Sequence, residues 1–175
     1  MLLSTSIRRG VAEKRSDRVD ALVEATVAEL RANGYEGLTV RNAARRAGVG
    51  AATAYTYFAS KDHLVAEVFW RRLQTLEPAP VDGRHNARTR VSHALRELAL
   101  LIADEPELAA ASTTAILAPE PDVQRLRSRI GTAFNEHLAA ALGDDADPAV
   151  LRALNLALAG ALSAARHPTS RRSRS

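Results

Sequence analysis

The stretch Leu38–Lys61 reads LTVRNAARRAGVGAATAYTYFASK, and it predicts two short helices joined by a tight turn and followed by the start of a third. Thr39 precedes the first helix, at 40–47, as an N-cap, because its hydroxyl accepts a backbone N–H that a helix start leaves without a partner. Gly48 ends that helix in the left-handed conformation, which costs glycine no Cβ clash. A second helix at about 51–58 completes a predicted helix-turn-helix.

The two predicted helices have one inward and one outward face. Small inward side chains allow the helices to cross closely at a steep angle. At this spacing the inward residues are Ala43, Ala44, Ala47, Val49, Ala54 and either Tyr57 or Phe58. The outward residues are Arg41, Arg45, Arg46, Thr53, Tyr55 and Thr56.

The same stretch has a one-sided charge. No Asp or Glu occurs between Glu36 and Asp62, whereas Arg41, Arg45, Arg46 and Lys61 supply positive charge. Contacts with phosphates dominate the affinity of proteins for DNA, so an acid-free basic surface favours binding to the DNA backbone.

These motifs resemble those of the tetracycline-repressor (TetR) family of transcriptional regulators over roughly the first 75 residues, where combined spacing is more specific than any single element. The residues that carry the resemblance are Gly34, Tyr35, Leu38, Thr39, Val40, Arg41, Ala44, Ala47, Gly48, Val49, Thr53, Tyr55, Tyr57, Phe58, Ser60 and Lys61. The resemblance implies an all-helical dimer whose N-terminal domain binds double-stranded operator DNA and whose variable C-terminal domain binds a small ligand. It also implies phosphate contacts at Thr39, Tyr55, Tyr57 and Lys61, although core packing is an equal alternative for Tyr57.

Direct readout of bases needs hydrogen-bonding side chains or methyl groups in the major groove. The second helix offers no Arg, Lys, Asn or Gln there, only Ala51, Ala52, Thr53, Tyr55 and Thr56. We therefore expect Arg41 to carry base hydrogen bonds and Ala51, Ala52 and Thr53 to contact thymine methyl groups. Arg45 is expected to make at most a peripheral contact, because a solvated helix face explains both Arg45 and Arg46.

The N-terminal segment 1–16 is predicted to be a basic flexible arm, either disordered or lying along DNA through Arg8 and Arg9. An amphipathic helix at 17–33 then packs on the helix-turn-helix, giving a DNA-binding domain at 17–59. Ser60 caps a helix at 60–76 that links this domain to the next.

The segment 77–166 is predicted to form a ligand-binding and dimerisation domain, with helices at 86–103, 107–117 and 122–142. Their apolar stripes would enclose a cavity for a small hydrophobic ligand, although a filled core is equally consistent with the pattern. Asn135 is expected at the edge of the cavity. The candidate ligand-binding residues are Leu98, Ile102, Thr113, Thr114, Leu117, Phe134 and His137.

The last predicted helix, 148–165, is apolar nearly all round, which predicts a dimer interface because such a helix must be covered on every side. We expect the tail 167–175 to be disordered and the domain to lack the last helix that the family usually has. The candidate interface residues are Leu151, Leu154, Leu158, Ala161 and Leu162.

Charge separates the two halves of the chain. Residues 1–76 hold 12 Lys and Arg against 8 Asp and Glu, whereas residues 77–165 hold 8 against 12. This asymmetry is expected when only one domain meets nucleic acid. The chain has no Cys, no apolar run of membrane-spanning length and no signal-peptide core, so we expect a cytoplasmic protein without membrane contact.

No catalytic pattern is visible. The five His residues share no paired spacing, and they predict scattered surface positions rather than a metal site. The glycines form no phosphate-binding loop, and no Ser or Thr lies in a nucleophile-elbow pattern. We expect no cofactor and no enzymatic activity.

These patterns predict an all-α, ligand-responsive transcriptional regulator. The preferred interpretation is a repressor that binds a palindromic operator as a homodimer and is released by a small hydrophobic ligand. The alternative is a helical small-molecule-binding or protein-interaction module whose DNA-binding helices are vestigial.

Overall fold

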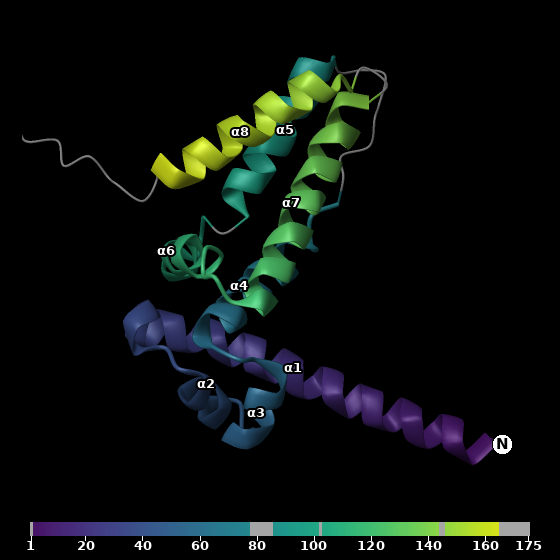
Figure 1. Cartoon of the computed structure of the whole chain (residues 1–175), viewed down its shortest axis with the longest axis vertical. Helices are drawn as coiled ribbons and strands as arrows, with labels where there is room; N and C mark the ends of the chain where they lie inside the picture. Colours follow the sequence, from purple (N-terminus) through teal and green to yellow (C-terminus); the bar gives the residue numbers. More distant parts are fainter. Residues whose placement is uncertain (1, 78–85, 102, 144–145, 165–175) are drawn as a thin grey trace, which may run out of the picture.

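The computed structural model describes residues 2–77, 86–101, 103–143 and 146–164. The described part is all-helical, as the sequence predicts, and its eight helices lie in two groups joined end to end (Figure 1). The helices are α1 (Leu2–Gly37), α2 (Val40–Arg46), α3 (Ala51–Tyr57), α4 (Lys61–Leu73), α5 (Ala87–Leu100), α6 (Pro106–Ala115), α7 (Pro121–Leu142) and α8 (Pro148–Ala164). The first group, α1, α2 and α3, holds the predicted DNA-binding domain and is called the DNA-binding group below, and α5, α7 and α8 form the second group.

Helix α1 is longer than the sequence predicts. It begins at Leu2 instead of Asp17, so it includes most of the segment 1–16 that the sequence assigns to a flexible arm, and it projects beyond α2 and α3 (Figure 1). Helical geometry is interrupted at Gly34, whose φ of 64° agrees with the end of the predicted helix at residue 33. The side chains of Arg8 and Arg9 lie outside the described residues, and their contact with DNA stays a prediction.

The helix-turn-helix forms as the local sequence predicts. The Oγ1 of Thr39 accepts the backbone N–H of Asn42 at 3.0 Å and caps α2. Gly48 takes a φ of 66° in the turn, and the N–H of the next residue, Val49, donates to the carbonyl of Ala44 at 2.9 Å. These two features fix where α2 begins and how the chain leaves it.

The inward face of the helix pair is largely buried. Ala43, Ala44 and Ala54 are at most 1% exposed. Phe58 is 3% exposed, whereas Tyr57 is only partly buried, so Phe58 is the aromatic residue that enters the core. The predicted crossing through small residues is therefore present, because the closest positions carry only methyl groups.

The core of the DNA-binding group includes a helix from the second half of the chain. Leu108, Ala111 and Ala115 of α6 belong to the same buried cluster as Leu22 and Leu30 of α1. The sequence assigns α6 to the ligand-binding domain, but in the structure α6 packs against α1 and α4. Helix α6 therefore contributes to the core of the DNA-binding group.

Helix α4 contacts both groups of helices. Val65 and Val68 face α1 and α6, whereas Phe69 and Leu73 face α5, α7 and α8. Ala66 packs with Val123 on the start of α7 in a third cluster. The linking role predicted for this helix follows from burial on several sides.

Polar contacts also join the two groups. Glu105, which precedes α6, accepts hydrogen bonds from Arg31 of α1 at 3.3 Å and from Arg72 of α4 at 2.9 Å. Ser60, the N-cap of α4, donates to Glu120, the N-cap residue of α7, at 2.5 Å. The first turns of α6 and α7 are therefore attached to the DNA-binding group by carboxylates.

A pair of glycine substitutions tests the turn. We expect Gly48→Ala to destabilise the protein by about 1–2 kcal/mol, because an L-residue at positive φ clashes with its own backbone. Gly131→Ala is the control: Gly131 lies inside α7 with nothing within 4 Å of an added Cβ, so this change should stabilise by about 0.5–1 kcal/mol. Urea unfolding measures both, and equal effects would contradict the assigned role of Gly48.

Candidate DNA-binding surface

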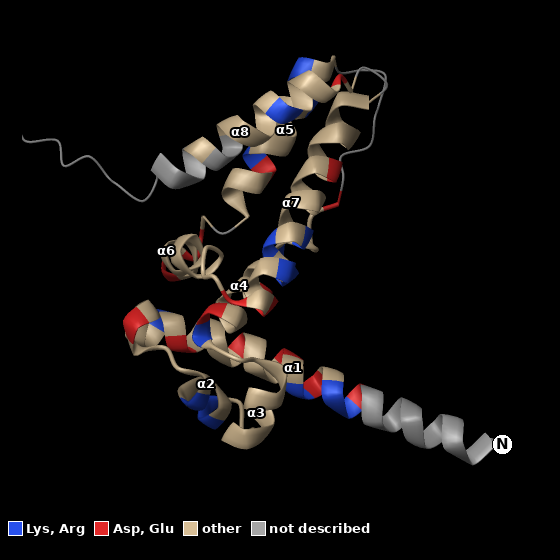
Figure 2. Cartoon of the chain, in the orientation of Figure 1, with Lys and Arg blue, Asp and Glu red and all other residues tan. Residues whose placement is uncertain are grey.

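The outward face of the helix pair carries the residues predicted to bind DNA. Arg41 and Arg45 on α2 are exposed, and so are Ala52, Tyr55 and Thr56 on α3. Figure 2 shows the positive charge on α2 and none of either sign on α3. The charge of the surface therefore comes from the first helix of the motif and not from the second.

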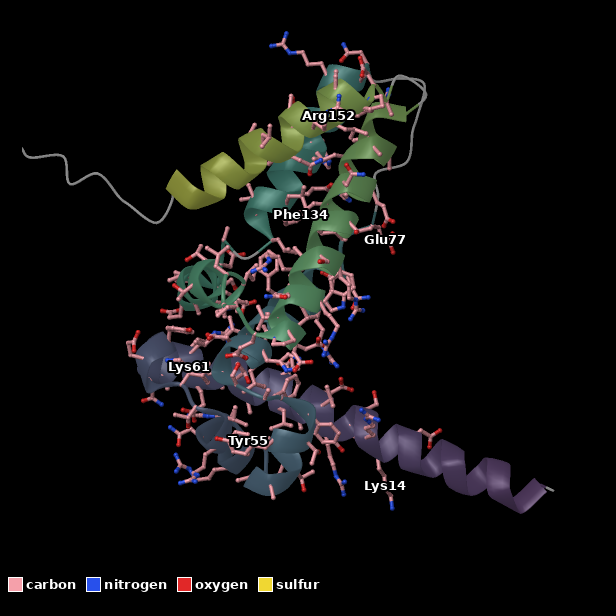
Figure 3. All side chains as sticks on the ribbon, in the orientation of Figure 1. Lys14, Tyr55, Lys61, Glu77, Phe134 and Arg152 are labelled. Carbon is pink, nitrogen blue, oxygen red and sulfur yellow. The ribbon has the colours of Figure 1, made fainter. Side chains whose placement is uncertain are left out.

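Helix α3 presents mainly methyl groups and one phenol. The side chain of Tyr55 lies on this helix (Figure 3), and the residue is 51% exposed. Ala51 and Thr53 are partly buried. The hydroxyl of Thr56 donates to the carbonyl of Thr53 at 2.6 Å, so its proton is already used within the helix. The surface is suited to contacts with thymine methyl groups and, through Tyr55, to a phosphate oxygen.

Tyr57 has two neighbours of different kinds. Its ring packs against the core of the DNA-binding group, and the guanidinium of Arg15 from α1 lies 5.6 Å from the ring centroid. Core packing, one of the two alternatives for Tyr57, is therefore present. The cation–π contact brings Arg15 to the end of α3, and the sequence motif gives no signal for this placement.

The sequence predicts a solvated helix face for Arg46, and its side chain is 43% exposed, but it also has a partner inside the protein. Its Nε donates to Oε1 of Glu29 at 2.7 Å, and Glu29 is 3% exposed. Asn33 donates to the other oxygen of Glu29 at 2.7 Å. The hydrogen bond from Arg46 holds the pKa of Glu29 below its ordinary value although burial acts the other way. Much of the charge of Arg46 is thus compensated inside the protein.

Lys61 is engaged at the base of the DNA-binding group. Its Nζ donates to the carbonyl of Tyr35 at 3.1 Å and lies 4.0 Å from the ring centroid of the same residue. The hydroxyl of Tyr35 donates to Asp62, and burial together with this bond raises the pKa of Tyr35. The side chain of Lys61 is 30% exposed. A phosphate contact by Lys61 stays a prediction, and it must compete with these internal partners.

An open groove lies beside the turn. It has a volume of about 320 Å³ and runs between α1 and the segment that joins α2 to α3. Asp17 and Arg18 line the α1 side, whereas Gly48, Gly50 and Thr53 line the opposite side. The long α1 therefore extends the candidate surface past the helix-turn-helix itself.

The candidate ligand-binding residues are only partly brought together. Leu98 and Phe134 belong to the buried cluster between α5 and α7, and Phe134 lies between these helices in Figure 3. His137 is 7% exposed on the same face of α7, which contradicts its predicted surface position. Thr113 is partly buried, Thr114 is exposed, Leu117 is 54% exposed, and Ile102 lies outside the described residues. Asn135 is exposed and accepts a hydrogen bond from Asn155 at 3.0 Å.

The candidate dimer residues differ in placement along α8. Leu151 and Leu154 pack against the cluster between α5 and α7 within one chain. Val150 and Leu156 instead face outward, at 43% and 74% exposure. The side chains of Leu158, Ala161 and Leu162 lie outside the described residues. No helix in the described part of the chain is long and apolar enough to cross a membrane.

Residues 22–68 match the sequence model of a family described as bacterial regulatory proteins, tetR family. An uncharacterized HTH-type transcriptional regulator of Mycobacterium tuberculosis H37Rv is 44% identical over 143 residues, which are 81% of this chain and 67% of that protein. The HTH-type transcriptional repressor KstR of Rhodococcus jostii RHA1 is 26% identical over 74% of this chain and 62% of that protein.

Solved structures share the fold. A TetR transcriptional regulator from Rhodococcus sp. RHA1 aligns with a TM-score of 0.70 at 21% identity, covering 86% of this chain and 82% of its own. The transcriptional regulator FadR from Bacillus subtilis, solved in complex with stearoyl-CoA, aligns with a TM-score of 0.58 at 17% identity over 81% of each chain.

The pair of buried Glu29 and partly exposed Arg46 predicts an asymmetric response to substitution. Arg46→Met should cost about 1–2 kcal/mol, because it leaves the buried carboxylate without its cation while solvent already screens the pair. Glu29→Gln should cost less, because Arg46 has a side chain that is 43% exposed and water can reach it. Urea unfolding at pH 7 measures the difference, and an equal cost would contradict the assigned burial.

The pair of Glu29 and Arg46 also determines whether the free energy of unfolding rises or falls with pH. A carboxyl whose folded pKa lies below its unfolded pKa contributes stability above the unfolded pKa, and this contribution is lost as the pH falls through the folded pKa. The wild type should therefore lose more stability than Glu29→Gln between pH 6 and pH 3. Parallel stability curves over this window would contradict the ion pair.

Proposed function

The chain belongs to the TetR family of bacterial transcriptional regulators, and we propose that it is a repressor that binds a palindromic operator as a homodimer and leaves DNA when a small hydrophobic ligand binds. The observation that carries this proposal is the exposed, acid-free surface of α2 and α3 with Arg41 and Tyr55. A regulator of this kind works on chromosomal DNA, which is in the cytoplasm of bacteria.

The proposed DNA contacts divide into readout and positioning. Arg41 is exposed in the first turn of α2, and we assign it to base edges because α3 carries no charged or amide side chain. Tyr55 and Thr39 are assigned to phosphates. Arg45, Arg15 and Arg18 lie around the same surface and add electrostatic attraction that does not depend on sequence. The relative named as a repressor, KstR, supports the sign of regulation.

The proposed dimer uses the outward face of α8. Val150 and Leu156 are large apolar residues exposed on this helix, and Ala149, Ala153 and Ala157 of the same helix are small and exposed. Small residues allow close approach of a symmetry-related helix. Leu151 and Leu154, which pack inside the chain, would then support the interface from below instead of forming it.

The proposed ligand enters the apolar region between α5 and α7. Leu98 and Phe134 lie there, and FadR of Bacillus subtilis, which shares the fold, holds stearoyl-CoA. A ligand that separates these helices displaces Phe69 and Leu73 of α4, which pack into the same cluster. Because α4 also lies in the core of the DNA-binding group, such a change alters the spacing of two DNA-binding surfaces in a dimer.

DNA binding is tested with duplexes from the region upstream of the gene, titrated at several salt concentrations. Arg41→Ala should cost about 1–3 kcal/mol in specific binding and reduce discrimination against random DNA, as loss of a base contact does. Arg45→Ala should weaken binding to the upstream duplex and to random DNA by the same factor. It should also reduce the slope of log affinity against log salt concentration by about one. Arg88→Ala, an exposed arginine on α5, is the control and should change neither.

The alternative, a ligand-binding module with vestigial DNA-binding helices, predicts a different outcome for this titration. Such a module would bind operator and random DNA equally or not at all. Equal affinity of the wild-type protein for both duplexes would therefore overturn the proposed regulator.

The dimer is tested by Leu156→Glu. At 74% exposure this residue contributes little to a monomer, so the substitution should leave thermal stability of the isolated chain within about 0.5 kcal/mol while dissociating the dimer. Analytical ultracentrifugation measures the association. Gln124→Glu, an equal charge change at an exposed position of α7, is the control and should not alter it. A Leu156→Glu protein that remains dimeric would refute the α8 interface.

A further inference from the structure

The N-terminal part of α1 projects past the helix-turn-helix as a continuation of the same helix (Figure 1). In the described residues of α1, Leu2–Gly37, helical geometry is interrupted only at Gly34. Arg15 lies at the end of α3, because its guanidinium is 5.6 Å from the ring centroid of Tyr57. Residues 2–14 continue the helix beyond this contact. They span about 20 Å, because an α-helix rises about 1.5 Å per residue.

The base of this projection carries three exposed cations. Lys14, Arg15 and Arg18 are all exposed, and spacings of three and four residues place them on one side of α1. That side faces the helix pair, because Arg15 contacts the ring of Tyr57 and Arg18 lines the groove beside the turn. Figure 3 shows the side chain of Lys14 pointing to the side of α1 on which α2 and α3 lie. The three charges therefore extend the basic surface of α2 along α1.

The acidic side chains of this part of α1 lie mainly on other sides of the helix. The carboxylate of Asp20 accepts a hydrogen bond from Arg71 of α4, which fixes the direction of that side. Glu13 precedes Asp20 by seven residues, or about two turns, so it lies on the same side. Asp17 lies between the two sides and lines the groove with Arg18. The charge of α1 is therefore divided between a basic side next to α2 and α3 and an acidic side next to α4.

We propose that the N-terminal part of α1 is a second DNA-binding element, which binds phosphates on the flank of each half-site, outside the base pairs that α2 and α3 contact. This role rests on the proposed function, because the helix pair must first place the protein on its operator. Phosphates are the partners because lysine and arginine side chains on a basic surface neutralise the DNA backbone. A length of about 20 Å corresponds to about six base pairs, since phosphates of one strand are about 3.4 Å apart along the duplex.

The helical state of this element decides how it binds. The sequence alone predicts a flexible basic arm at 1–16, and a flexible arm loses conformational entropy when it becomes ordered on DNA. In the structure this segment is helical from Leu2 and continues into the part of α1 that is buried at Leu22. Its cations therefore keep a fixed direction relative to α3 and bind without that ordering cost. The contact is independent of the flanking sequence, since phosphates carry no sequence information.

The experiment compares two duplexes that contain the operator from the region upstream of the gene. The short duplex ends at the outer base pairs of the palindrome, and the long duplex adds about six base pairs of unrelated sequence at each end. We expect the full-length wild type to bind the long duplex more tightly. The slope of log affinity against log salt concentration should be steeper on the long duplex by about 0.9 for each flanking phosphate contacted.

Ser16→Pro separates the charge of this element from its rigidity. Proline removes one backbone hydrogen bond and clashes with the carbonyl four residues earlier, so it breaks α1 before its buried part while every Lys and Arg stays. The variant should bind the short duplex as the wild type does and lose the excess affinity for the long duplex. Ser16→Ala is the matched control and should keep that excess. A thermal melt close to that of the wild type shows that the rest of α1 is intact.

Lys14→Ala tests the charge without breaking the helix. It should lower the salt slope on the long duplex by about one and leave the slope on the short duplex unchanged. Arg88→Ala removes the same charge from an exposed position on α5 and should change neither slope.

Three results would overturn the second DNA-binding element. They are equal wild-type affinity for the two duplexes, an undiminished excess in Ser16→Pro, and an equal loss on both duplexes in Lys14→Ala. Failure of the proposed function gives a different result, because it abolishes specific binding to the short duplex as well.

Discussion

Burial of α4 on several sides is the constraint on which the rest of the structure depends. Leu64 and Val65 are fully buried in the core with α1 and α6, whereas Phe69 and Leu73, each 5% exposed, enter the cluster of α5, α7 and α8. Interiors are close-packed, so a helix held in this way cannot shift in one core without disturbing the other. The two groups of helices are therefore mechanically coupled through side-chain packing, whatever a ligand does.

Polar contacts around α4 add to this coupling, because they join the ends of helices from both groups. Glu105 binds Arg31 of α1 and Arg72 of α4 through one carboxylate that is 14% exposed, and Ser60 binds Glu120 at the start of α7. All five residues lie at or near helix ends, where a small rotation of a helix produces its largest lateral displacement. Charged hydrogen bonds in partly buried sites tolerate little misalignment. A change in the angle of α6 or α7 therefore disturbs the hydrogen bonds to α1 and to α4.

The local parts of the fold could be predicted from the sequence, and the long-range contacts could not. Thr39 and Gly48 decide their own backbone positions, because capping and positive φ depend only on neighbouring residues. Helix α6 packs on α1 through Leu108. The sequence pattern of α6 shows that one face is apolar, but it does not indicate which group of helices covers that face. Glu29 lies 17 positions from Arg46, and no periodicity joins them. The sequence predicts an exposed His137, but the residue is buried because it packs near Glu97 of α5. A contact between two helices leaves no signal in the sequence pattern of α7 alone.

The internal ion pairs also shape how the candidate surface can meet DNA. Of the four cations in the acid-free stretch, Arg46 donates to Glu29 and Lys61 donates to the carbonyl of Tyr35. Arg41 and Arg45 are exposed, and Arg46 is exposed in part. Each phosphate neutralised contributes about 0.9 to the salt slope, so a protomer with few such contacts binds random DNA weakly. Weak background binding raises the ratio of specific to non-specific affinity, provided that two surfaces act together at fixed spacing. The Glu29–Arg46 pair thus compensates part of the positive charge of α2 and in return attaches α2 to α1 by a hydrogen bond to a buried carboxylate.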